Sequence, residues 1–152
     1  MTFEEELKRH GGFVFTNVGD SMKPLIRQGR DLLEITARPE GRLKKYDIPL
    51  YRRDGRYILH RILKVRESDY IVAGDHNYRL ELVTDAQIIG VLTGLTRDGK
   101  RISLSGAAYR VYLFFWCGLY PIRAVALYML SLPRRIMMRT KNRKRKNTEG
   151  RR

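Results

Sequence analysis

Residues 48–65 have the sequence IPLYRRDGRYILHRILKV, and this stretch decides the expected fold. Asp54 and Gly55 form a strong two-residue hairpin signal, because a type I′ turn needs positive φ at both of its central positions. The turn would join a strand over residues 48–52 to a strand over residues 56–65. We therefore expect an antiparallel hairpin whose second strand carries His60.

Further short segments, rich in aromatic and β-branched residues, lie on both sides of this hairpin. They predict strands over residues 13–18, 32–37, 70–73, 87–95 and 101–104. Asp98 and Gly99 provide a second hairpin turn between the last two. Short strands at this spacing predict a mainly β fold, in the form of a small antiparallel sheet or a partly closed barrel.

A short helix is expected before the first strand. Thr2 and Glu5 fit a capping box at its start, and Gly11 with Gly12 ends it. The chain has 152 residues, of which 43% are hydrophobic, so it is long enough for one core and too short for two. We expect one β-domain over residues 1–105.

Residues 111–132 are apolar enough, and long enough, to meet a membrane. Arg123 and Pro121 oppose a clean span, because a charge is costly in lipid and proline interrupts helical hydrogen bonding. Three arrangements therefore remain open. They are a single transmembrane helix, two short interfacial helices over residues 111–120 and 122–132, and burial of the segment within the domain.

The net charge of +15 is concentrated at the C-terminal end of the sequence. Residues 133–152 contain ten Lys or Arg and one acid, so they carry nine of those charges. This distribution argues against a nucleic-acid groove on the folded surface. We expect a membrane-associated segment over residues 106–133 and a disordered basic tail over residues 134–152. A membrane is then the expected partner in place of nucleic acid, and the side that the β-domain faces stays open.

The single cysteine, Cys117, lies in the apolar segment and cannot form an intramolecular disulfide. It is expected to be a small buried side chain and not a reactive thiol. No cluster of Cys and His has the spacing of a zinc site. We therefore expect neither a metal nor a cofactor.

Three short polar motifs interrupt the expected strands. In VGDSMKP (residues 18–24), Ser21 lies in a bend between glycine and proline, where backbone N–H groups can face a substrate carbonyl. A serine hydroxyl needs a base to become a nucleophile, and His60 is the candidate. The third motif is GDHN (residues 74–77). Judged singly, each motif is also typical of an ordinary turn or of a structural histidine.

The succession of serine motif, strand, hairpin, His-Arg strand and Gly-Asp-x-Asn resembles the signal peptidase and LexA-like superfamily of serine peptidases. The resemblance covers about residues 13–95. It is to the branch that uses histidine, where other members have a catalytic lysine. That branch includes the endoplasmic-reticulum, archaeal and sporulation-associated signal peptidases. The resemblance implies a serine endopeptidase that cleaves a leader or signal peptide after small residues, with a peptide or preprotein as substrate.

Roles for individual residues are carried over from this resemblance. Ser21 matches the nucleophile, and His60 matches the general base. Asp75 matches the acid that orients the histidine in a Ser-His-Asp arrangement. Glu81 falls near a second acidic position of the branch, with a looser match. The β-domain would then be the catalytic domain.

Substrate-binding roles are implied for two residues beside the serine. Met22 would line the substrate pocket. Gly19 stands where many relatives have a hydroxyl residue that helps to form the oxyanion hole, so the backbone N–H of Ser21 would carry more of that role. Asp20 is unusual beside a developing negative charge, and we expect its side chain to point away.

Two other functions remain open. A LexA-like self-cleaving protein would need a lysine base, and Lys44 and Lys45 lie off the base position. A non-catalytic β-domain could instead be held at an acidic membrane or at RNA by basic residues such as those at 143–146. The neighbouring apolar segment favours lipid over RNA.

Overall fold

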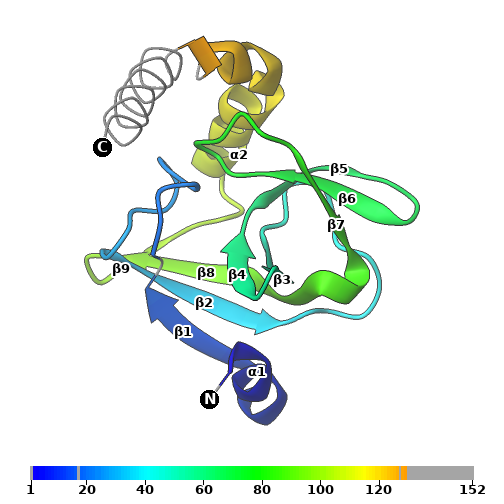
Figure 1. Cartoon of the computed structure of the whole chain (residues 1–152). Coiled ribbons are helices and arrows are strands. Elements are labelled where there is room, and N and C mark those ends of the chain that lie inside the picture. Colours follow the sequence, from blue (N-terminus) through cyan, green and yellow to red (C-terminus); the bar gives the residue numbers. More distant parts are fainter. Residues whose placement is uncertain (1, 17, 127, 130–152) are drawn as a thin grey trace, which may run out of the picture.

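The computed structural model describes residues 2–16, 18–126 and 128–129, and it has a mainly β architecture (Figure 1). This confirms the predicted fold class. The strands are β1 Gly12–Thr16, β2 Asp31–Ala37, β3 Pro49–Arg53, β4 Arg56–Leu59, β5 Arg61–Val65, β6 Asp69–Ala73, β7 Glu81–Thr84, β8 Ile88–Arg97 and β9 Lys100–Ile102. The helical elements are α1 Phe3–His10, the 3₁₀ turn η1 Asp85–Gln87, α2 Ala107–Leu113 and the π-helical turn η2 Phe114–Gly118.

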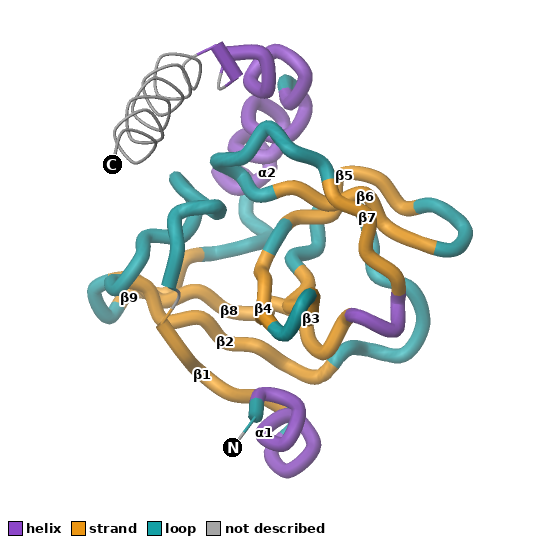
Figure 2. Tube along the Cα trace, viewed as in Figure 1, coloured by secondary structure: helices purple, strands orange, loops and turns teal. Residues whose placement is uncertain are grey.

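The strands form two antiparallel sheets (Figure 2). The larger sheet has the order β1-β2-β8-β3-β4, with β9 also paired to β8, and the smaller sheet has the order β5-β6-β7. The larger sheet curls into a half-barrel. Register shifts between Glu34 and Ile35 and between Leu50 and Tyr51 are irregularities of the kind that bend a strand.

Local signals at the N-terminus and at the hairpins form the structures that they predict. Thr2 and Glu5 make both hydrogen bonds of a capping box at the start of α1. The turn between β3 and β4 has φ of 50° at Asp54 and 74° at Gly55. The turn at residues 98–99 has matching values of 49° and 75°. These positive angles agree with the type I′ geometry expected from Asp-Gly.

The predicted strand over residues 56–65 is two strands, which corrects the expectation that His60 lies within one. β4 ends at Leu59, which pairs with Leu50 in the larger sheet. β5 begins at Arg61, which pairs with Ala73 in the smaller sheet. His60 is therefore the residue at which the chain passes from one sheet to the other.

Two hydrophobic cores lie against the sheets. The first includes residues of α1, β2, β3 and β8 together with Met22 from the loop between β1 and β2. The second packs β3 against the smaller sheet, and Tyr51 is fully buried in it. Consecutive residues Leu50 and Tyr51 thus face different cores, because side chains alternate along a strand.

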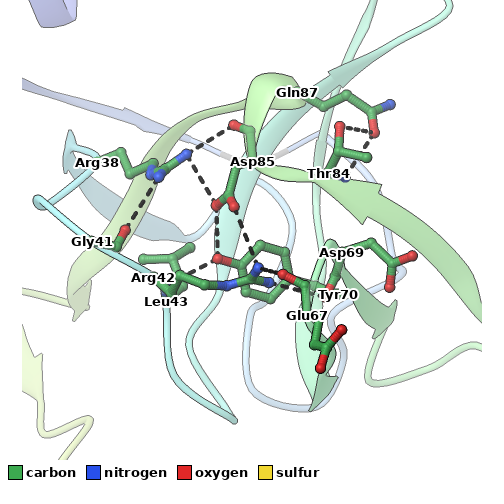
Figure 3. Close-up of polar contacts among 10 residues, drawn as sticks. All are labelled: Arg38, Gly41, Arg42, Leu43, Glu67, Asp69, Tyr70, Thr84, Asp85 and Gln87. Carbon is green, nitrogen blue, oxygen red and sulfur yellow. Dashed lines mark hydrogen bonds and ion pairs between the residues drawn. The ribbon is translucent and has the colours of Figure 1, made fainter.

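A polar cluster around Asp85 ties the connection between β2 and β3 to the smaller sheet (Figure 3). The Asp85 carboxylate accepts a hydrogen bond from the Tyr70 hydroxyl at 2.7 Å and lies 3.1 Å from the Arg38 guanidinium. The Tyr70 hydroxyl accepts a hydrogen bond from the backbone N–H of Leu43 at 3.2 Å. These contacts hold the connection between β2 and β3 against β6 and the turn η1.

The apolar C-terminal segment is helical where it is described. α2 runs into η2, and residues 120–126 are helical again after a break at Leu119. Pro121 explains the irregular turn before it, because its ring cannot donate a hydrogen bond and crowds the preceding turn. In the described part of the chain, no helix is both long enough and apolar enough to cross a membrane. Residues 127 and 130–133 of the expected membrane segment, and the tail expected to be disordered, lie outside the described residues.

Candidate active site

Ser21 lies on the loop between β1 and β2, and this loop is anchored at both its middle and its end. Met22 and Leu25 are buried in the first core. Arg97 of β8 donates to the Leu25 carbonyl oxygen at 2.7 Å and to the buried carboxylate of Asp31 at 2.8 and 2.6 Å. Ser21 itself stays partly exposed. The loop is therefore fixed while its serine remains accessible.

The residues beside the serine differ in part from their expected roles. Met22 is 0% exposed and packs in the core, so it anchors the loop and does not line an open pocket, which corrects its predicted role. Gly19 has φ of 139°, which a residue with a Cβ rarely adopts. Asp20 is exposed and pairs with Lys23 at 2.8 Å, so its carboxylate is turned to solvent.

The turn after β6 packs directly on the serine, where the loop after β1 and the loop before β7 meet (Figure 1). The backbone N–H of His76 donates to the Ser21 carbonyl oxygen at 2.7 Å. A Cβ at Gly74 would lie 2.5 Å from that oxygen and 3.0 Å from the Ser21 Cβ. The glycine of the GDHN motif is therefore needed for the turn to approach the serine.

The ladder between β5 and β6 brings the third motif to the same place. Arg61 and Ala73 form the last pair at one end of this ladder. His60 directly precedes Arg61 and Gly74 directly follows Ala73, so both lie at that end. Gly74 in turn contacts the serine loop. His60 and the turn over residues 74–77 thus lie at one end of the smaller sheet, and the turn packs on the Ser21 loop.

His60 is 4% exposed and contacts groups from two strands. Its Nδ1 lies 3.0 Å from the Tyr51 hydroxyl of β3 and 3.8 Å from the Glu81 carboxylate of β7. The Tyr51 hydroxyl donates to the same Glu81 oxygen at 2.7 Å, and Arg53 lies 3.2 Å from it. Burial lowers the pKa of His60, and the negative charges of Glu81 and Asp75 oppose this effect without cancelling it. The imidazole is therefore mainly neutral near pH 7.

Asp75 does not bond to the histidine, which corrects its predicted role. Its carboxylate accepts hydrogen bonds from Arg61 Nε at 2.8 Å and Nη2 at 2.7 Å, and from the Tyr112 hydroxyl at 2.8 Å. A guanidinium can form two parallel hydrogen bonds with one carboxylate. Arg61 is in reach of Asp75 because it pairs across the ladder with Ala73, two residues before Asp75. Burial alone would lower the pKa of Arg61, but the hydrogen bonds and charge of Asp75 raise it overall, so the guanidinium stays charged.

The C-terminal helix covers this buried pair, a role that sequence reasoning missed. Trp116 Nε1 donates to the Asp75 backbone carbonyl at 2.7 Å, and Arg123 donates to the same oxygen at 2.5 Å. Tyr109 and Tyr112 stack with ring centroids 6.0 Å apart. A signal was present, because these aromatic residues and Arg123 recur at intervals of three, four and seven residues, which places them on one helical face.

Other potentially reactive groups do not join the site. Cys117 is buried, as predicted, and burial raises the pKa of its thiol to about 11, so the thiolate is not populated at neutral pH. Within residues 2–16, 18–126 and 128–129, no group of three or more His, Cys, Asp or Glu side chains is arranged to hold a metal ion.

An open groove of about 760 Å³ lies beside Glu81. Its walls come from the β3–β4 hairpin and from β7 with the residues before it, and both β4 and β7 are edge strands. Its lining combines apolar and charged side chains: Ile58, Leu80, Leu82, Arg53, Arg56, Arg79, Asp54 and Glu81. Unpaired strand edges can accept an added extended peptide.

A comparison with protein-family models finds none that matches this chain. A comparison with curated proteins finds no significant match.

Proposed function

We propose that the protein is a serine endopeptidase in which Ser21 is the nucleophile and His60 is the general base. The observation that carries this proposal is the close packing of the Gly74 turn on Ser21, at the ladder end where a neutral His60 also lies. A neutral imidazole can accept the proton of the serine hydroxyl. A serine in a turn with no base nearby is not activated in this way. The order of the motifs resembles that of histidine-using signal peptidases, which supports the same assignment.

In the proposed reaction, the Ser21 oxygen attacks the peptide carbonyl as its proton passes to His60. The protonated imidazole then gives that proton to the leaving amine, and water releases the acyl group by the reverse sequence. The backbone N–H of Ser21 is the proposed donor to the developing oxyanion. Gly19 offers no side-chain hydroxyl for that purpose.

The proposed substrate is an extended peptide with small residues at the first and third positions before the bond that is cut, as the resemblance implies. The groove between the β3–β4 hairpin and β7 supports an extended peptide, because two edge strands border it. Three arginines in its lining would favour acidic residues in the flanking part of the substrate.

We further propose that the protein associates with a membrane surface through the outer face of its C-terminal helix. Val111, Phe114, Phe115, Ile122 and Val125 are between 56% and 69% exposed on this helical segment. Contiguous exposed apolar side chains typically mark a contact with lipid or protein, and the ten Lys or Arg of residues 133–152 would favour anionic lipid. The same surface supports the second candidate function, a non-catalytic membrane-binding domain.

Incubation of the purified protein with a panel of leader peptides, followed by mass spectrometry, tests the peptidase. Ser21→Ala and His60→Ala should both fall to near background, because loss of a nucleophile or base costs several orders of magnitude in rate. Ser105→Ala and His10→Ala are matched controls at exposed positions and should cleave like the wild type. Cleavage by Ser21→Ala at the wild-type rate would leave the membrane-binding domain as the function.

A further inference from the structure

We infer that Tyr51 and Glu81 set the tautomer and orientation of His60, in the place usually taken by an aspartate bonded to the histidine. This inference rests on the proposed function for its catalytic meaning. Its structural content concerns three side chains that meet at the sheet junction. They lie in an order that runs from Glu81 through the Tyr51 hydroxyl to His60 Nδ1.

Proton counting decides which nitrogen of His60 carries hydrogen. The Tyr51 hydroxyl has one proton and two neighbours, the Glu81 oxygen at 2.7 Å and His60 Nδ1 at 3.0 Å. An ionised carboxylate can only accept, so the Tyr51 proton goes to Glu81. The Tyr51 oxygen then accepts from His60, which requires a proton on Nδ1. Nε2 is left with a lone pair, which is the form that a general base needs.

The charged groups around His60 support this assignment. Arg53 of β3 forms an ion pair with the same Glu81 oxygen at 3.2 Å, and the Tyr51 hydroxyl donates to that oxygen. Burial and Glu81 together raise the pKa of Tyr51, so its hydroxyl keeps its proton. Asp75 adds a further negative charge from the turn after β6, but its carboxylate is bound by Arg61.

Every proton in the proposed transfer from Ser21 to His60 can be accounted for. When Nε2 takes the proton of Ser21, the imidazolium keeps its Nδ1 proton on the Tyr51 oxygen, and Tyr51 keeps its own proton on Glu81. No proton moves to Glu81. Its negative charge, 3.8 Å from Nδ1, stabilises the imidazolium while the serine adds to the substrate. Tyr51 and Glu81 are thus positioning residues that act through His60.

Two-bond ¹H–¹⁵N correlation spectra of the full chain, labelled at histidine, test the tautomer directly. Ser21→Ala is the background, because it leaves the three side chains intact and prevents self-cleavage. His60 should show the Nδ1–H pattern at pH values where it is neutral, with exposed His10 and His76 as internal references. An Nε2–H pattern for His60 in this background overturns the inference.

Two conservative substitutions separate the parts of the relay. Tyr51→Phe keeps the ring but removes the oxygen, so His60 should lose its Nδ1–H preference, and cleavage should fall by about 10²–10⁴-fold. Glu81→Gln keeps an acceptor for Tyr51 but removes the charge, so the tautomer should stay while the pKa of His60 falls further. Circular dichroism and thermal melting establish that each variant is folded. A Tyr51→Phe protein that is folded and keeps both the tautomer and the cleavage rate contradicts the relay.

The outcomes also separate this inference from the proposed function. If no leader peptide is cut by the wild type but His60 shows the Nδ1–H pattern, the peptidase proposal loses its support and the tautomer assignment stands. If Ser21→Ala abolishes cleavage but His60 shows the Nε2–H pattern, the peptidase stands and the relay is wrong.

Discussion

Replacing Arg61 with methionine should destabilise the protein more than any comparable change to an exposed ion pair. Arg61 is 0% exposed and Asp75 is 2% exposed, so the substitution leaves a buried carboxylate without its two guanidinium hydrogen bonds. Removing one partner of a buried ion pair costs about 3–5 kcal/mol. That is a large part of the free energy of unfolding of a small domain, which is typically about 5–15 kcal/mol.

Urea unfolding followed by tryptophan fluorescence is the assay. Trp116 is the only tryptophan of the chain and donates directly to the Asp75 carbonyl, so its emission reports on this region. Arg101→Met is the matched control. It breaks an ion pair with Glu34 in which the Arg101 side chain is 66% exposed, and it should cost under about 1 kcal/mol.

A double variant guards against an Arg61→Met protein that does not fold. Replacing Asp75 with leucine at the same time removes the uncompensated charge, so the double variant should be more stable than Arg61→Met alone. The reasoning fails if Arg61→Met costs no more than Arg101→Met. It also fails if the second substitution brings no recovery.

Three further outcomes are expected. Because burial lowers the pKa of His60 in the folded protein, peptidase activity should be constant down to about pH 6.5 and should fall only at a pH below that value. The free energy of unfolding should already begin to fall near pH 6.5, since the unfolded chain binds the additional proton there before the folded protein does. Rates of peptide cleavage and urea midpoints across pH measure both effects. Gly74→Ala should abolish cleavage and lower the thermal midpoint, because its Cβ would lie 2.5 Å from a backbone oxygen of the serine loop. Replacing Phe114 and Phe115 together with serine should weaken flotation of the protein with vesicles that contain anionic phosphatidylglycerol, because both rings are exposed.

Each of these expectations has its own control. Peptidase activity that rises only at the higher pH values where a lysine loses its proton would contradict the assignment of His60 as the base. Gly118→Ala is the control for the glycine substitution, because a Cβ there meets nothing within 4 Å, and it should melt like the wild type. Flotation that is unchanged by the double serine substitution would show that the apolar helical face does not carry membrane binding. Vesicles of neutral phosphatidylcholine separate the apolar contribution from that of charge.

The features predicted correctly from the sequence are those that depend on a few adjacent residues. The Asp54-Gly55 turn forms because its two residues accept positive φ, and the capping box forms within one helical turn. The break at His60 could not be predicted in the same way. Its cause is the pairing of Leu59 and Arg61 in different sheets, and strand partners are set by contacts distant in sequence.

The candidate site follows the same division. Sequence order predicts one site for Ser21, His60 and the turn over residues 74–77. The β5–β6 register brings His60 and Gly74 to one end of the ladder, and Gly74 contacts Ser21. The sequence did not predict that the Tyr51 hydroxyl is the partner of His60 Nδ1. Tyr51 reaches His60 through the packing of β3 against the smaller sheet, and that packing depends on contacts distant in sequence. Whether the gathered residues cut peptides stays a prediction.

Arg123 and Trp116 reach back to Asp75 from the part of the chain that follows the last strand. A ribosome makes these residues well after Ser21 and His60, so a nascent chain can form both sheets before the covering helix exists. During that interval the Arg61–Asp75 pair stays open to water, and the turn that touches the serine lacks its final support. The turn over residues 74–77 would thus gain its final hydrogen bonds only after Arg123 has been made.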